Sequence, residues 1–123
     1  MNPSLKYLEL KSGFNDDGPA WIGEIQFSNS GKGIYFNNML LLGNGHGLCI
    51  NVETSEEYWV TGIKKNGANR HWTGRGKIKI DKKCIAEYLS LTNAKFLDMN
   101  KFEIVEICPT NKSRFTEFLN AKL

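Results

Sequence analysis

The sequence predicts a mainly β protein of the α+β class. We expect a small antiparallel curled sheet, or a partly open barrel, of about six to seven strands, with a short helix after Asp81 and a C-terminal helix. Short runs rich in β-branched and aromatic residues alternate with polar turns along the chain, a pattern typical of consecutive strands. The 12 glycines and only 3 prolines indicate many tight turns. Strands joined in sequence by short turns pair antiparallel.

The expected strands follow from these runs and from the turn residues that separate them. They cover residues 5–10, 20–28, 33–42, 48–52, 57–64, 76–80 and 102–108. The second and third, Trp21 to Leu42, are expected to form a hairpin around Asn29-Ser30-Gly31-Lys32. Along the strand at 76–80, Ile78 and Ile80 alternate with Lys77 and Lys79, which predicts one apolar and one basic face.

Two helices are predicted by capping residues and apolar spacing. Asp81 is a candidate N-cap for a helix over residues 82–91, whose apolar stripe is Ile85, Tyr88 and Leu89. Near the end of the sequence, Thr110 or Asn111 is expected to cap a short helix. Its buried residues are expected to be Phe115, Phe118 and Leu119.

The length of 123 residues favours a single domain. We expect residues 1–91 to form a compact β unit with its capping helix, and residues 92–123 to form a strand–helix appendage. The sequence has neither a secretory signal pattern nor an apolar run of membrane-spanning length. The three widely spaced cysteines, Cys49, Cys84 and Cys108, are expected to be reduced. We therefore expect a cytoplasmic protein that does not engage a membrane.

Charge is distributed unevenly along the chain. The formal net charge is only +3, but residues 63–83 carry +7 and the remainder carries −4. A concentrated basic segment of this kind is typical of a surface that meets phosphates or acidic partners.

The basic segment is therefore the candidate site for nucleic-acid or partner binding. The candidate residues are Lys64, Lys65, Asn69, Arg70, His71, Trp72, Arg75, Lys77 and Lys79. Cations that reach a phosphate backbone, beside an aromatic platform, are what binding of single-stranded nucleic acid requires. This predicts weak, sequence-tolerant nucleic-acid binding. The competing interpretation is a solvated sheet edge kept soluble by its lysines, with Trp72 in the core.

Two other functions remain open from the residues alone. One is a protein-interaction module, such as an immunity, inhibitor or regulatory subunit, that docks an acidic partner. The other is a small metal-independent nuclease in which His46 and His71 act as an acid–base pair. No recognisable nucleophile, metal motif or cofactor motif is present, so we expect a binding module that is not an enzyme and holds no cofactor or metal. Trp59 and Trp72 flank the polar connection, a position that allows one of them to remain partly exposed.

Three stretches also carry a resemblance: Tyr58 to Ile78, Gly18-Pro19-Ala20-Trp21-Ile22 and Ile34-Tyr35-Phe36-Asn37. Over residues 6–91 the chain resembles a family of small bacterial proteins of unassigned function that often carry the label 1-deoxy-D-xylulose-5-phosphate synthase. The resemblance implies a compact bacterial domain. It implies no synthase activity, because a thiamine-diphosphate enzyme needs a Gly-Asp-Gly metal motif and the nearest string, Gly43-Asn44-Gly45, lacks the carboxylate.

Overall fold

The computed structural model describes residues 4–11, 18–67, 69 and 76–118. In chain order the strands are β1 (Ser4–Leu10), β2 (Ala20–Phe27), β3 (Gly33–Phe36), β4 (Met39–Leu42), β5 (Gly47–Asn51), β6 (Glu57–Gly62), β7 (Ile78–Asp81) and β8 (Phe102–Val105). A 3₁₀ turn, η1 (Lys82–Cys84), leads into α1 (Ile85–Thr92), and a second 3₁₀ turn, η2 (Lys112–Phe115), follows β8.

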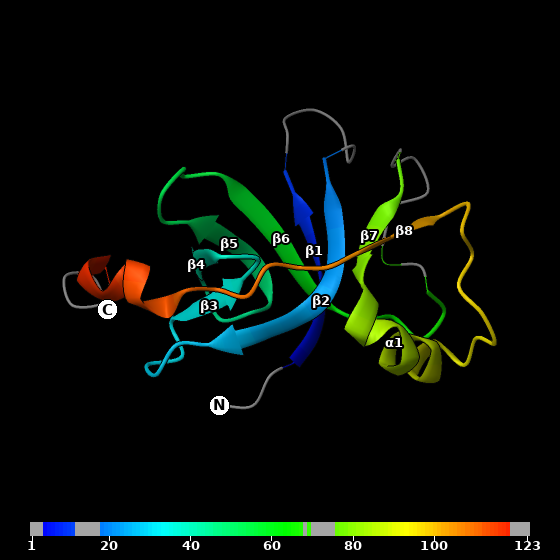
Figure 1. Ribbon diagram of the computed structural model, residues 1–123. Coiled ribbons are helices and arrows are strands. Elements are labelled where there is room, and N and C mark those ends of the chain that lie inside the picture. The colour runs from blue at the N-terminus through cyan, green and yellow to red at the C-terminus, as the bar shows by residue number, and fades with distance from the viewer. Residues whose placement is uncertain (1–3, 12–17, 68, 70–75, 119–123) are drawn as a thin grey trace.

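Six of the strands close into an antiparallel barrel (Figure 1). Their order is β1-β6-β5-β4-β3-β2, and pairing of β1 with β2, from Ser4↔Ile25 to Glu9↔Ala20, closes the ring. The mainly β fold class is thus confirmed, and the described sheet is a closed barrel with two further strands and two short helices.

The strand from residue 33 to residue 42 was predicted as one element and is in fact two. β3 and β4 form a hairpin whose turn is Asn37-Asn38, with φ of 49° and 60°. A positive φ at both central residues is the requirement of a type I′ hairpin turn, and asparagine tolerates it better than most residues. The prediction treated residues 33–42 as one continuous strand, so it missed this reversal.

β7 and β8 extend the sheet beyond the barrel and depart from the antiparallel pairing expected of all strands. β7 pairs parallel with β2, through Trp21↔Lys79 and Ile22↔Ile80, and β8 pairs parallel with β7. Parallel neighbours need a long crossover connection. Both pairs meet this requirement: β3 to β6 lie between β2 and β7 in the chain, and α1 with the following loop lies between β7 and β8.

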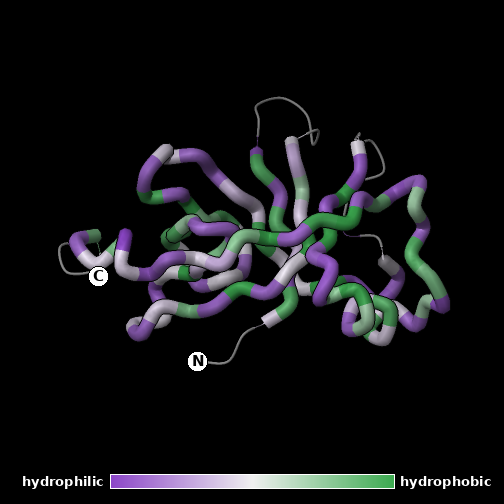
Figure 2. Tube along the Cα trace, viewed as in Figure 1, coloured by the Kyte–Doolittle hydropathy of each residue, from purple (hydrophilic) through white to green (hydrophobic). Residues whose placement is uncertain are grey.

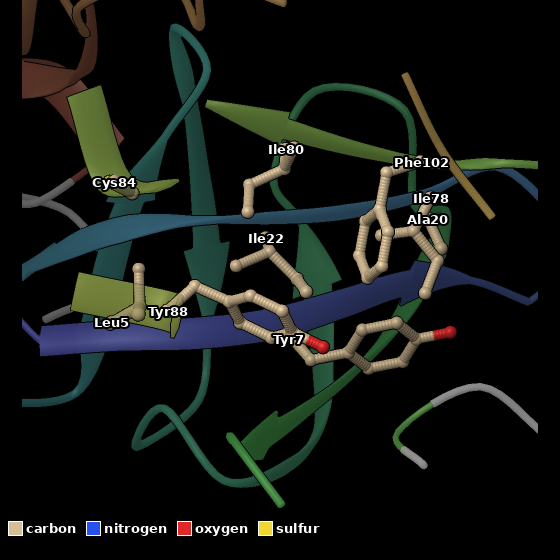
Figure 3. Packing of buried hydrophobic residues seen from close by; sticks show 9 residues of the cluster. All are labelled: Leu5, Tyr7, Ala20, Ile22, Ile78, Ile80, Cys84, Tyr88 and Phe102. Carbon is tan, nitrogen blue, oxygen red and sulfur yellow. The ribbon is translucent and has the colours of Figure 1, made fainter. Parts of the chain in front are cut away.

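The first two strands are buried on both faces, because each face contributes to a different core. Leu8 and Ile25 point into the barrel, together with Phe36 and Val60. Residues of the opposite face pack under α1, as Figure 3 shows. They are Leu5, Tyr7, Ala20 and Ile22, joined by Ile78, Ile80, Cys84, Tyr88 and Phe102. Figure 2 colours the chain by hydropathy, and hydrophobic residues contribute to every barrel strand, most continuously to β4.

Helical turns form at both predicted places: Asp81 caps η1, which continues into α1, and Asn111, one of the two predicted candidates, caps η2. The Asp81 side chain accepts a hydrogen bond from the Lys83 N–H at 3.4 Å, and Asn93, with φ 56°, ends α1. At the second helix, Asn111 Oδ1 accepts from the Ser113 N–H at 3.3 Å. Phe115 is fully buried against the outer side of the barrel, next to Tyr35 and Leu40.

A C-terminal strap, residues 106–111, connects β8 to η2 across the barrel (Figure 1). The Asn37-Asn38 turn anchors it: Asn37 Oδ1 accepts from the Cys108 N–H at 3.2 Å, and Asn38 Oδ1 accepts from the Asn111 N–H at 3.0 Å. The Asn38 N–H donates in turn to Thr110 Oγ1 at 3.0 Å. The Asn37-Asn38 turn therefore holds the C-terminal segment in place.

Candidate functional site

Five of the nine predicted site residues are described by the structure: Lys64, Lys65, Asn69, Lys77 and Lys79. Arg70, His71, Trp72 and Arg75 lie outside the described residues. The predicted platform of Arg70 and Trp72 beside a basic strand face therefore remains a prediction.

The described lysines do not form one continuous ladder. β6 and β7 run in the same direction, because β1 is antiparallel to both β6 and β2 while β7 is parallel to β2. The end of β6 and the start of β7 consequently lie at opposite ends of the sheet. Lys64 and Lys65 follow β6, whereas Lys77 precedes β7, so these described lysines lie toward opposite ends of the sheet, as the course of β6 and β7 in Figure 1 shows.

Asn69 holds the connection after β6 in place. Its Oδ1 accepts from the Lys64 N–H at 2.8 Å, and its Nδ2 donates to the Gly62 carbonyl at 2.8 Å and to Thr61 Oγ1 at 3.2 Å. An amide that bonds both the end of β6 and the connection after it fixes how the connection leaves the strand. The side chains of Lys64 and Lys65 remain exposed beside it.

Lys79 lies beside an aromatic residue of β2 and an acidic residue of β8. Its Nζ lies over the Trp21 ring, 5.7 Å from the centroid, and Glu103 occupies the paired position on β8. The Trp21 ring in turn contacts Phe36 and Tyr58, with centroid separations of 6.5 and 6.1 Å. Lys79 therefore covers an aromatic group at the rim of the barrel core.

His46, the described member of the proposed acid–base pair, is exposed in the loop between β4 and β5. Its N–H donates to Asn44 Oδ1 at 3.1 Å. His71 lies outside the described residues, so the pairing stays untested. Within the described ranges, no group of three or more histidine, cysteine or acidic side chains is arranged to hold a metal ion.

A different surface collects large apolar side chains on the outside of the barrel. We define the β5–β6 face as Leu48, Ile50 and Trp59, which are 46%, 39% and 45% exposed. Leu48 and Trp59 are direct cross-strand partners, and Ile50 follows two residues after Leu48 on the same side of β5. Trp59 is thus the partly exposed tryptophan that the sequence allowed for.

The two-residue period of the strands explains why these side chains point outward. Cys49, Tyr58 and Val60 fill the barrel interior, so their neighbours along β5 and β6 must face outside. The alternation is readable in the sequence, but both sets are apolar, so the pattern alone does not reveal which set is buried. Closure of the barrel determines which of the two sets is buried.

Charge beside the β5–β6 face is mainly negative. The exposed Glu57 is the cross-strand partner of Ile50, and Glu56 is exposed next to it. Lys11 supplies a cation, with its Nζ 5.4 Å from the Trp59 ring centroid. Burial raises the pKa of Tyr58 beneath the face, and the carboxylate of Glu56 adds to that effect. A partner that meets this face meets an aromatic anchor with carboxylates at its edge.

Comparison with known proteins adds no relative. No family model, no curated protein and no solved structure matches the chain. The resemblance noted from the three sequence stretches therefore stays a prediction. Over the described residues, none of the helices has the length and apolar character needed to cross a membrane.

Proposed function

We propose that this protein is a protein-interaction module whose β5–β6 face docks a partner protein. The observation that carries the proposal is the contiguous row of Leu48, Trp59 and Ile50, which are 39–46% exposed on regular strands. A clustered apolar surface on a folded domain typically marks an interaction site. Tryptophan is also among the residues that most often anchor such interfaces.

The chemistry around the face selects the kind of partner. Exposed carboxylates at Glu56 and Glu57 favour a protein that presents an apolar protrusion rimmed by lysine or arginine. A second copy of this chain fits less well, because a two-fold contact would bring the same carboxylates of both copies to one interface. The proposed partner is therefore basic at its contact surface, opposite in sign to the acidic partner expected from the basic segment.

Site-specific photocrosslinking tests the proposal. A benzoyl-phenylalanine placed at position 48 or 59 should form an adduct of one defined mass with a single protein in the cells that make this chain. The same group placed at Lys95, exposed in the loop after α1, should not form that adduct. The crosslinked protein, once purified, should bind the unmodified chain reversibly.

Affinity measurements with that purified partner then decide the case. Trp59→Ala should weaken binding at least roughly 30-fold, the loss of about 2 kcal/mol typical of a central interface residue. Phe96→Ala is the matched control, since Phe96 is an aromatic side chain that is 78% exposed elsewhere on the surface. Equal affinities for both variants, or adducts formed alike from all three positions, would refute the proposal.

Nucleic-acid binding is the second candidate, favoured by the +7 charge of residues 63–83 and by the exposure of Lys64, Lys65 and Lys77. It predicts that single-stranded DNA binds at low salt and is released as salt rises. Lys64→Gln and Lys77→Gln should each weaken binding modestly and lower the salt dependence. Absence of binding at 20 mM salt would exclude this function and leave the first proposal unaffected.

We also retain a cytoplasmic location as a proposal. Cys49 and Cys84 are buried and unpaired, and Cys108 is exposed and unpaired. Cysteines that remain as free thiols are typical of proteins in a reducing compartment. Thiol counting on the protein isolated under alkylating conditions would test it, with three alkylated cysteines expected.

A further inference from the structure

A pocket of about 220 Å³ opens between α1, the loop that follows it and the start of β8. Its walls include the Tyr88, Leu89, Leu97 and Phe102 side chains, and Phe96 lines it while remaining 78% exposed. The segment that carries Phe96 and Leu97 runs between α1 and β8 in Figure 1. A dry cavity of about 150 Å³ is enough to admit a benzene molecule. The apolar side of this open pocket, formed by Leu89, Leu97 and Phe102, therefore has room for one aromatic ring, while Asn66, Asp98 and Lys101 line its polar side.

One polar group inside this pocket has no hydrogen-bond partner among the described residues. Tyr88 is 4% exposed, and among the described residues no donor or acceptor forms a hydrogen bond with its hydroxyl. The hydroxyl lies next to Gly67, another lining residue, because a β-carbon built there would stand 3.4 Å from the Tyr88 oxygen. A buried hydroxyl without a partner costs free energy, so such groups usually meet a ligand or water.

The Tyr88 hydroxyl is also in the right protonation state to bind a neutral ligand. Burial raises its pKa above the ordinary value of tyrosine, so the group keeps its proton across the neutral range. Its ring is held in an edge-on contact with Phe102, with centroids 5.4 Å apart, and both rings are visible in Figure 3. A fixed donor on an apolar wall orients a ligand by one hydrogen bond.

We infer that this pocket binds a small neutral aromatic molecule with one polar substituent, of the phenol class, and that the Tyr88 hydroxyl is its hydrogen-bond partner. The ring of the ligand would lie against Leu89, Leu97 and Phe102, and its substituent would point toward Tyr88. Phe96 would cover the exposed side of the ring. This site is separate from the β5–β6 face and does not depend on that face being an interface.

Titration with phenol and with toluene, followed by amide chemical shifts, tests the inference. In the wild-type chain both compounds should shift the amides of Gly67, Thr92 and Lys101 saturably, and phenol should bind more tightly. Tyr88→Phe removes only the hydroxyl and should leave the fold intact, because that group makes no hydrogen bond within the described protein. The substitution should lower the affinity for phenol roughly threefold to tenfold, which corresponds to the loss of one hydrogen bond. It should change the affinity for toluene less than twofold.

Two further variants keep the test decisive. Phe96→Ala, at an exposed position, should lower the affinity for both compounds, since it removes a side chain that both would contact. Trp59→Ala on the β5–β6 face should change neither affinity. Three results would each overturn the inference. They are chemical shifts that do not saturate at 20 mM ligand, shifts centred away from this pocket, and an equal loss of affinity for phenol and toluene in Tyr88→Phe.

Discussion

Ile107 of the C-terminal strap occupies the space beside Gly23 of β2. A β-carbon built on Gly23 would stand 2.7 Å from Ile107 Cδ1 and 2.9 Å from Phe36 Cε1. Ile107 is partly buried and packs against the cluster that fills the barrel, so the strap contacts the barrel core through this side chain. The absence of a side chain at position 23 is what lets the strap approach.

Gly23→Ala should therefore destabilise the protein by about 1–3 kcal/mol, the usual cost of overpacking a core. Gly62→Ala is the control, because a β-carbon there meets nothing within 4 Å. Chemical denaturation of both variants would measure the difference. In an Ile107→Val background, which lacks the Cδ1 atom, the cost of Gly23→Ala should fall by roughly a third or more. An unchanged cost in that background would contradict the proposed contact.

The Asn37-Asn38 turn gives a second test, since it combines an unusual backbone conformation with a role in holding the strap. Asn38 has φ 60°, and its side chain accepts from the Asn111 N–H. Asn38→Gly and Asn38→Ala both remove that hydrogen bond, but only alanine keeps the left-handed strain. Alanine should therefore cost about 1 kcal/mol more than glycine. Equal free energies of unfolding for the two variants would show that the backbone conformation is not strained.

Much of the fold follows from patterns that are local in sequence. Asp81 could be identified as a cap, and Asn111 as one of two candidates with Thr110, because a cap needs only a short polar side chain ahead of an apolar stripe. The hairpin at 37–38 was missed because both of its central residues are asparagine, within an otherwise apolar run. The parallel placement of β7 and β8 was also missed, since it depends on two long connections and not on strand composition.

The candidate site was harder to predict for a physical reason. Lys77 and Lys79 alternate with Ile78 and Ile80 as expected, but whether they join Lys64 and Lys65 depends on the relative directions of β6 and β7. Exposure of Leu48 and Ile50 depends in turn on which side of an all-apolar strand faces the barrel interior. Both are properties of the assembled sheet, so neither can be predicted from a single segment of the sequence.

The ion pair that fixes η2 to the barrel offers a third prediction. Arg114 Nη2 donates to both carboxylate oxygens of Glu53 at 2.8 Å, and Nη1 donates to the Asn38 carbonyl at 2.7 Å. The charged side chains are 35% and 39% exposed, so solvent screens the pair. A double-mutant cycle with Arg114→Gln and Glu53→Gln should give a coupling of about 0.5–1 kcal/mol that shrinks in 1 M NaCl.

A control for this cycle lies elsewhere on the same protein. Lys83 Nζ and Glu24 Oε1 are 3.8 Å apart, and the lysine side chain is 67% exposed. The looser and more hydrated pair should show a coupling close to zero. A larger coupling for Lys83 and Glu24 than for Arg114 and Glu53 would contradict the geometric argument.

The buried thiol of Cys84 makes stability depend on pH at the alkaline end. Burial raises its pKa from 9.0 to about 11, and the nearby carboxylates of Asp81 and Glu24 act in the same direction. Between pH 9 and 11 the unfolded chain therefore loses this proton before the folded chain does, so stability falls as the pH rises through that window. The urea midpoint of the wild type should drop more steeply between pH 8.5 and 10.5 than that of Cys84→Ala. Parallel slopes would show that other groups account for the loss.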